Sequence, residues 1–153
     1  MAEKTIIIKG DPVRLERNAA AAVTPGMLVE LTSSDTVQAH STAGGSCAPV
    51  LIALEDENQG KGIGDAYSTG NVVLFAAFKT GDVANMLLAD GETVVIGTKV
   101  ESYGDGYLRA VDTDASVGEV GVQSIVGTSL EALDFSGSSA VDPASQRFNV
   151  LIA

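Results

Sequence analysis

Short apolar segments alternate with turn-forming residues along the whole chain. The segments are four to seven residues long and are separated by clusters of glycine, aspartate, serine and threonine. Segments of this length suit strands rather than helices, and the clusters between them suit turns. We therefore predict an all-β fold, a small β-barrel or β-sandwich-like domain with long glycine-rich loops. The predicted strands are residues 5–9, 27–32, 36–40, 50–54, 72–78, 93–96, 107–110, 120–126 and 147–152.

Turn signals lie between these strands, and helical signals are few. Asp90-Gly91 and Asp105-Gly106 are dipeptides that accept positive φ and close tight hairpins. The remaining predicted elements are short helices at residues 18–23 and 82–89 and an exposed loop at residues 134–145.

Length and charge limit the functions that the chain can have. With 153 residues it is long enough for one domain with a real core. A net charge of −11 argues against a nucleic-acid surface, because phosphate contacts need lysine and arginine. The residues are 45% hydrophobic and only 19% charged, which indicates apolar surface covered in an oligomer. No apolar run approaches the ~18 residues of a membrane span, and the N-terminus lacks a signal-peptide layout. We expect no membrane partner and a protein made in a cytoplasm.

The first 17 residues differ chemically from the rest of the chain. They carry four basic and three acidic residues, a net of +1, whereas the remainder carries five basic and seventeen acidic residues, a net of −12. The triplet Ile6-Ile7-Ile8 lacks the alternation of a half-exposed strand. We therefore divide the chain into residues 1–17 and a single β-rich domain at 18–153. Residues 1–17 are either an extended arm that adds as a strand to a neighbouring sheet or the first strand of the fold. The predicted capsid or subunit contact residues are Lys4, Ile6, Ile7, Ile8, Lys9, Arg14 and Arg17.

No set of residues with the pattern of a catalytic or metal centre stands out. Nucleophilic catalysis needs a base beside the nucleophile, and the chain has a single histidine, His40, and a single cysteine, Cys47. We predict a solvent-facing His40 and a small, half-buried Cys47 rather than a reactive pair. The acidic runs 55–57 and 112–114 lack the spacing of a calcium loop and are predicted to be solvated loop edges. We expect no enzyme activity, no metal and no cofactor.

The glycine-rich stretch at residues 57–71 does not have the pattern of a phosphate-binding loop. A P-loop needs lysine followed by serine or threonine at the start of a helix, but Lys61 is followed by Gly62. We predict a structural loop in which glycines adopt conformations closed to other residues and the amphipathic Tyr67 ring anchors the loop. The residues assigned to this role are Gly60, Gly62, Gly64, Tyr67 and Gly70.

One enzyme family offers an alternative interpretation of this loop. Gly64-Asp65-Ala66-Tyr67 is similar to the substrate loop of the trimeric deoxyuridine-triphosphate pyrophosphatases, which are small all-β enzymes. In that family an aspartate activates water and a nearby tyrosine stacks on uracil. The spacing between acid and tyrosine differs here, and the Gly-Ser motif and the Arg-Gly-rich C-terminal arm of the family are absent. A small trimeric β nucleotide hydrolase is therefore the weaker alternative.

A longer series of motifs runs through residues 3 to 128. It consists of Val23-Thr24-Pro25-Gly26-Met27-Leu28-Val29-Glu30-Leu31, Val37-Gln38-Ala39-His40, Ala53-Leu54-Glu55, Gly60-Lys61-Gly62-Ile63, Asp65-Ala66-Tyr67, Gly70-Asn71-Val72 and Asp105-Gly106-Tyr107-Leu108. In this order the motifs resemble the small capsid decoration, or cement, proteins of tailed bacteriophages. These motifs are turns and strands, so the resemblance rests on structural residues.

The resemblance implies a structural virion protein. Such a protein is assembled in the host cytoplasm, binds the major capsid protein on the outer capsid surface, and stabilises the contacts between capsid subunits. It also implies a homo-oligomer, with a trimer favoured over a dimer. A phage-derived binding module, such as a fibre or a glycan-binding β domain, is the main alternative. Glycan binding usually exposes aromatic platforms, and this chain has seven aromatic residues and no tryptophan.

Overall fold

The computed structural model describes residues 4–111, 124–137 and 147–153, and these residues are almost entirely strands and turns. The predicted all-β fold is confirmed. The elements in chain order are β1 (Ile7–Lys9), β2 (Val13–Ala19), β3 (Leu28–Leu31), β4 (Thr36–Ala39), β5 (Val50–Ala53), the 3₁₀ turn η1 (Glu57–Gln59), β6 (Val72–Phe78), β7 (Val83–Leu87), β8 (Thr93–Val94), β9 (Lys99–Ser102), β10 (Leu108–Ala110), β11 (Ile125–Ser129), β12 (Leu133–Asp134) and β13 (Arg147–Ile152).

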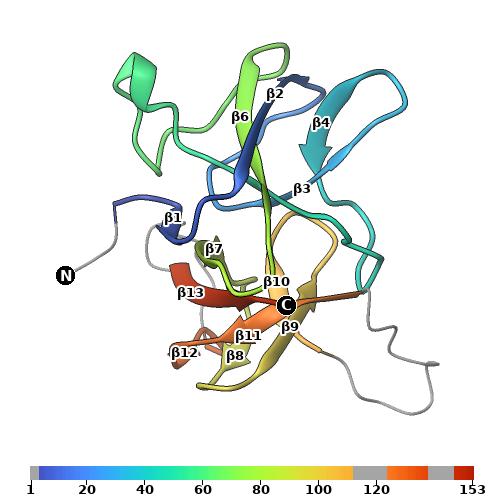
Figure 1. Ribbon diagram of the computed structural model, residues 1–153. Coiled ribbons are helices and arrows are strands. Elements are labelled where there is room, and N and C mark those ends of the chain that lie inside the picture. The colour runs from blue at the N-terminus through green and yellow to red at the C-terminus, as the bar shows by residue number, and fades with distance from the viewer. Residues whose placement is uncertain (1–3, 112–123, 138–146) are drawn as a thin grey trace.

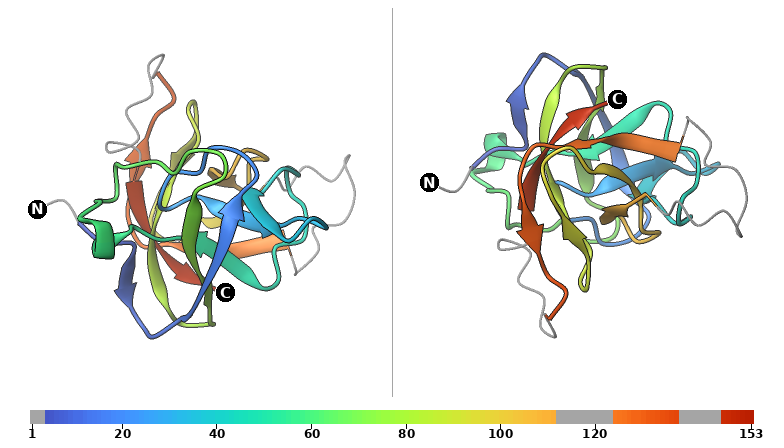
Figure 2. Two further views of the ribbon diagram at one scale, coloured as in Figure 1. Left: turned by 90° about the horizontal axis from the view of Figure 1, so that it is seen from above. Right: turned by 90° about the horizontal axis from the view of Figure 1, so that it is seen from below.

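The strands form a barrel and an open sheet that lie against each other. The closed barrel has the order β2-β4-β3-β5-β6 and occupies the upper half of Figure 1. The six-stranded sheet has the order β1-β7-β13-β11-β9-β10 and lies below it, and β12 and β8 form a separate two-stranded sheet. In both views of Figure 2 the blue strand β1 lies at the margin of the molecule, as expected for the end strand of its sheet.

Strand β6 connects the two parts, because its side chains alternate between two apolar cores. Val73 and Phe75 belong to the cluster inside the barrel. Ala76 and Phe78 belong to the larger cluster between the barrel and the six-stranded sheet. Since successive side chains of a strand point to opposite faces, a strand covered on both faces is apolar throughout, as in Val72–Phe78. This explains why residues 72–78 were predicted with the observed bounds.

The two predicted helices are wrong. Residues 82–89 contain strand β7, whose residues Val83–Leu87 are all buried. Because successive side chains point to opposite faces, β7 is covered on both faces, which removes the alternation that marks a half-exposed strand. Residues 18–23 begin as the end of β2 and continue into a turn, after which Val23 forms an isolated bridge with Tyr67.

Other strands were missed or shifted. β2, β9 and β12 were not predicted. β11 begins at Ile125, whereas the predicted strand was 120–126; residues 120–123 of that prediction lie outside the described residues. The predicted loop at 134–145 begins at the last residue of β12, and its residues 138–145 also lie outside the described part.

The predicted turn glycines have the expected conformation. Gly91 has φ 85° and Gly106 has φ 86°. At Gly106 a side chain would also be crowded, because a Cβ there would lie 3.1 Å from the side chains of Ala39 and Met27. This close contact joins the β9–β10 turn to the base of the barrel, and the N–H of Leu28 donates to the Gly106 carbonyl at 2.9 Å. Among the described residues no helix is long and apolar enough to cross a membrane.

Candidate functional site

Residues 5–9 form part of this chain's own fold, in agreement with a first strand rather than an extended arm. Ile6 has no exposed surface and belongs to the larger core cluster. Its N–H donates to Glu55 Oε2 at 3.2 Å, and its carbonyl accepts from the N–H of Asn85 at 2.8 Å. Strand β1 then pairs antiparallel with β7, with Ile7 opposite Ala84. In this conformation Ile6 is unavailable to a partner, which removes it from the predicted contact residues.

The acidic run at 55–57 has a structural role that its sequence does not reveal. Glu55 and Asp56 are buried rather than solvated, and only Glu57 is exposed. The Glu55 carboxylate accepts from the Thr5 hydroxyl as well as from the Ile6 N–H. The Asp56 carbonyl accepts from the N–H groups of Gln59 and Lys61 in the following turn. The prediction of a solvated loop edge is therefore wrong for Glu55 and Asp56, while residues 112–114 lie outside the described part.

A groove of about 690 Å³ lies beside this N-terminal segment. Its walls are the beginning of the described chain, the exposed strand β2 and the segment that follows β5, and Leu74 of β6 also lines it. Three of the predicted contact residues meet here, namely Ile7, Arg14 and Arg17. The other basic ones, Lys4 and Lys9, are exposed and do not line the groove.

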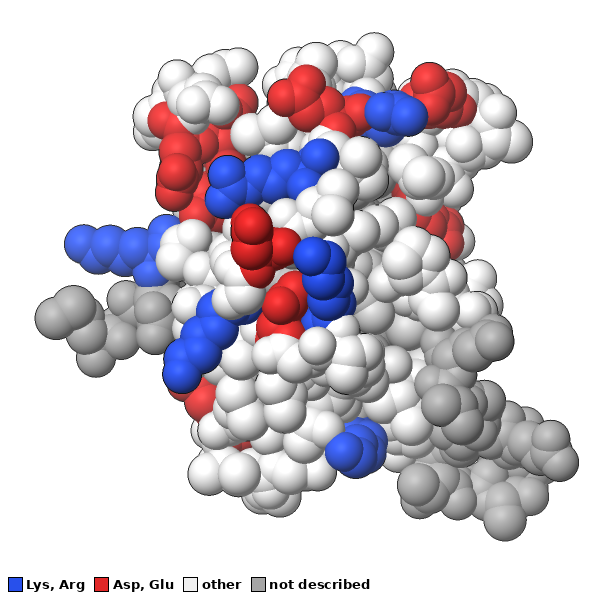
Figure 3. Space-filling view, viewed as in Figure 1, with Lys and Arg blue, Asp and Glu red and all other residues white. Residues whose placement is uncertain are grey.

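The charges on this side of the molecule are mixed. Figure 3 shows basic and acidic side chains close together over its upper part, and fewer charges over its lower part. Arg17 forms an exposed ion pair with Asp35, in which Nε lies 2.6 Å from Oδ1, and its Nη1 donates to the Glu16 carbonyl at 2.7 Å. Arg14 forms no ion pair within the described residues, although it is exposed. Arg14 is thus a cation available to a partner on this face.

Tyr67 anchors the glycine-rich loop to the barrel, in agreement with the role predicted for it. The side chain is buried, and its hydroxyl donates to the carbonyl of Leu54 at 2.7 Å. Main-chain bonds of 2.7 Å and 3.1 Å join Tyr67 to Val23 in both directions. Burial raises the pKa of Tyr67 to about 12. The ring is thus part of the barrel core and is unavailable for stacking on a base.

The glycines of this loop do not share one role. Gly60 ends η1 with φ 70°, and Gly70 has φ 85°, so both occupy the left-handed region that disfavours other residues. Gly62 and Gly64 do not have positive φ, and a Cβ would meet nothing closer than Asp65 Oδ2, 3.8 Å from Gly62. The expectation that Gly62 needs a conformation closed to other residues is wrong.

Arg147, near the C-terminal end of the chain, also binds this loop. This contact was not predicted from the sequence. Its Nη2 donates to the Ile63 carbonyl at 2.6 Å, while Nε and Nη1 are buried with no hydrogen-bond partner in the described structure. Burial lowers the pKa of Arg147. A Cβ at Gly26 would lie 2.5 Å from Nη1, so glycine is required there for the guanidinium to fit. No local sequence signal identifies a contact between residues 84 positions apart.

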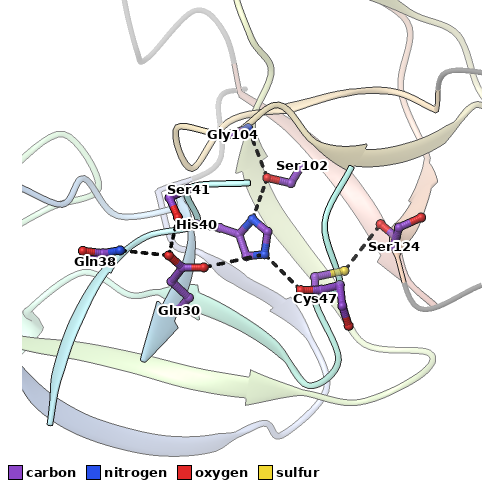
Figure 4. A network of polar contacts seen from close by, with 9 residues as sticks. Glu30, Gln38, His40, Ser41, Cys47, Ser102, Gly104 and Ser124 are labelled. Atoms are coloured by element: carbon purple, nitrogen blue, oxygen red, sulfur yellow. Dashed lines mark hydrogen bonds and ion pairs between the residues drawn. The ribbon is translucent and has the colours of Figure 1, made fainter. Parts of the chain in front are cut away.

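His40 joins the barrel to the six-stranded sheet and is buried, so the predicted solvent-facing histidine is wrong. Its Nδ1 lies 2.8 Å from the Ser102 hydroxyl, and its Nε2 lies 3.0 Å from the Ser46 carbonyl (Figure 4). Because a carbonyl only accepts, Nε2 carries a proton, and in the neutral ring Nδ1 accepts from Ser102. Glu30 Oε2 lies 3.9 Å from Nε2. Burial raises the pKa of Glu30, but hydrogen bonds from Ser41 and Gln38 and the nearby His40 leave the pKa lowered overall.

Cys47 is buried beside this network rather than half-buried. Figure 4 shows its sulfur directed away from the His40 ring and toward Ser124, whose carbonyl lies 3.5 Å from Sγ. Burial raises the pKa of the Cys47 thiol, whereas a nucleophilic cysteine needs a lowered one. Within the described ranges no three histidine, cysteine or acidic side chains are grouped to hold a metal. The geometry favours a structural role for both residues.

Comparison with known proteins finds similarity in the fold alone. No protein-family model and no curated relative matches the sequence. Among solved structures, the fold is similar to the crystal structure of the N base of head fiber gp8.5 of bacteriophage phi29, with a TM-score of 0.58 and 10% sequence identity. The alignment covers 94% of this chain and 95% of that chain. The two folds are therefore similar over nearly the full length of both chains.

Proposed function

We propose that this chain is a structural protein of a phage virion that binds the outside of the capsid and stabilises the contacts between major capsid subunits. The observation that carries the proposal is the shared fold with the base of a phage head fiber across nearly all of both chains. The motif series that resembles capsid decoration proteins points in the same direction independently. The buried His40, Cys47 and Tyr67 support a role without catalysis.

We propose β1 as the strand that contacts the capsid. It is one of the two end strands of the six-stranded sheet, β10 being the other, so one of its edges has no strand partner within the described residues. An exposed edge can accept an extended segment of another protein through main-chain hydrogen bonds. Lys4, which precedes the strand, and Lys9, its last residue, are exposed, and Ile7 and Ile8 are half-buried. The contact is therefore an edge presented by the folded domain and needs no free arm.

Co-sedimentation with capsids that lack this protein tests the proposal. The wild-type protein should sediment with the capsids and should raise the temperature at which they release their DNA. The variant Lys4→Glu/Lys9→Glu should bind at least tenfold more weakly. Lys61→Glu/Lys99→Glu is the matched control, because it makes the same change in charge at exposed positions outside β1. A wild-type protein that fails to bind capsids would contradict the proposed function, and equal binding by both variants would contradict the assignment of β1.

The second candidate is the base of a head fibre, which the similarity to the phi29 head fiber base favours. A fibre base also binds the capsid but need not stabilise it. The two are distinguished by the same particles: a decoration protein raises the DNA-release temperature, whereas a fibre base binds without raising it.

A further inference from the structure

Strand β2 has a long edge without a strand partner. It pairs with β6 from Val13 to Asn18, but it pairs with β4 only at Asn18 and Ala19. Residues 13–17 therefore have a neighbour on one side only within the described structure. All of Val13–Asn18 is exposed. This is an accessible strand edge at a closed barrel, a fold that otherwise removes edges.

The hydrogen-bond pattern shows which residues face the open side. The N–H of Ala19 donates to Asn71 beside β6, and the N–H of Ala20 donates to Val37 of β4, each at 2.8 Å. Because main-chain groups of successive strand residues point to opposite sides, Arg14 and Glu16 direct their N–H and C=O groups away from β6. Of these groups only the Glu16 carbonyl has a hydrogen-bond partner within the described structure, the exposed Arg17 Nη1. The open edge therefore offers two residues for pairing with another strand.

We propose that two copies of this chain associate through this edge, with their β2 strands antiparallel and the two-fold axis at Leu15. In this register Arg14 lies opposite the second copy's Glu16, and Glu16 lies opposite the second copy's Arg14. Both are hydrogen-bonded pairs, so the two residues of each pair exchange two main-chain hydrogen bonds. The two barrels then share one continuous sheet with the order β6-β2-β2-β6.

Charge complementarity identifies a second copy as the occupant. With the axis at Leu15, opposite charges face each other directly across the strands, a favourable cross-strand arrangement. With the axis at Arg14 or at Glu16, the residue on the axis would face its own copy and like charges would meet. A cation, Arg14, and an anion, Glu16, flank Leu15 on this edge. Two copies of the edge are therefore complementary in charge in one antiparallel register.

The same register covers apolar side chains that the single chain leaves in water. Val13 is 53% exposed and Leu15 is 37% exposed. They lie on the same face of the sheet, because β2 residues 13 and 15 stand opposite Ala77 and Phe75 of β6. At the axis Leu15 meets Leu15 of the second copy in a non-hydrogen-bonded pair, the closer of the two kinds of antiparallel pair. Val13 meets the aliphatic part of the second copy's Arg17.

Substitutions that reverse the charges of Arg14 and Glu16 test this dimer. The purified wild-type protein should sediment as a dimer. Arg14→Glu and Glu16→Arg should each weaken dimerisation by about 10- to 100-fold, since each converts both opposite-charge pairs into like-charge pairs. The double variant Arg14→Glu/Glu16→Arg should recover the dimer, because it restores opposite charges with the order reversed. Lys61→Glu serves as the control for a change in net charge alone.

Hydrogen exchange provides a second readout that does not depend on side-chain charge. The amide protons of Arg14 and Glu16 should exchange slowly in the dimer and quickly after dilution to the monomer. A wild-type protein that stays monomeric at all concentrations would overturn the proposal. The charges of Arg14 and Glu16 would then protect the edge of β2 against pairing with another strand. An oligomer that neither single variant weakens would also overturn it, because its contact would lie elsewhere. Neither measurement involves capsids, so its result is independent of the proposed function.

Discussion

Replacing Ile6 with alanine tests whether the N-terminal segment holds the fold together. The side chain has no exposed surface and packs in the core between the barrel and the six-stranded sheet. At about 0.8 kcal/mol for each buried methylene, the three carbons lost in Ile6→Ala account for roughly 2.4 kcal/mol of the free energy of unfolding. Because hydrogen bonds to Glu55 and Asn85 hold the Ile6 backbone in place and restrict collapse of the cavity, we expect a total loss of about 2–5 kcal/mol.

Chemical denaturation and thermal unfolding measure this loss. In a chain of this size the expected change corresponds to a decrease in Tm of about 5–15 °C. Ile8→Ala is the matched control, because Ile8, two residues along in β1, is only half-buried and its substitution should cost less than half as much. If Ile6→Ala unfolds within about 0.5 kcal/mol of the wild type, as expected for an exposed site, the segment does not belong to the core and the arm interpretation stands instead.

Three other substitutions probe the loop and the joint between barrel and sheet. Gly70→Ala should destabilise by about 1–2 kcal/mol because φ is 85° there, whereas Gly64→Ala, in open space without positive φ, should be nearly neutral in the same unfolding assay. Tyr67→Phe should cost about 1–2 kcal/mol by leaving the Leu54 carbonyl without its partner. Because the pKa of Tyr67 is raised to about 12, its contribution is fully present below about pH 10 and is lost as pH rises toward 12; Tyr67→Phe should lack that alkaline loss, and an identical profile would refute the assignment. His40→Ala should cost about 1–3 kcal/mol in the same assay, because the buried Ser102 hydroxyl and the Ser46 carbonyl lose their hydrogen bonds to the ring.

Strands whose local pattern reflects their surroundings were predictable from sequence. In β13 the buried residues Phe148, Val150 and Ile152 alternate with more exposed ones, and the predicted bounds agree with the structure. The prediction for β7 failed because both its faces are covered, and because its alanine, methionine and leucine residues favour helices when judged locally. β2 was missed for the opposite reason, since Val13–Asn18 are all exposed and the alternation of Val13 and Leu15 with charged residues ends after four positions.

The candidate site was less predictable than the fold. Tyr67 was correctly assigned as the anchor of its loop because an amphipathic ring in a polar loop has few other roles. The contacts of His40 could not be predicted, since Ser102 is 62 positions away and only the packing of barrel against sheet brings them together. The Arg147 contact to Ile63 has the same cause. Sequence patterns describe neighbours along the chain, whereas these side chains are held by neighbours across two sheets.

The N-terminal segment unites the two proposed contacts. Its first strand, β1, ends the six-stranded sheet, and its second strand, β2, leaves an open edge on the barrel. Both edges proposed as contacts therefore belong to the residues that carry a net of +1, in a chain whose remainder carries −12. Two such acidic bodies repel each other, and this repulsion is least where the surface near the contact is not acidic. A contact made through residues 1–17 keeps the acidic remainder of each copy farther from the interface. This gives a physical reason for making both contacts through the same short segment.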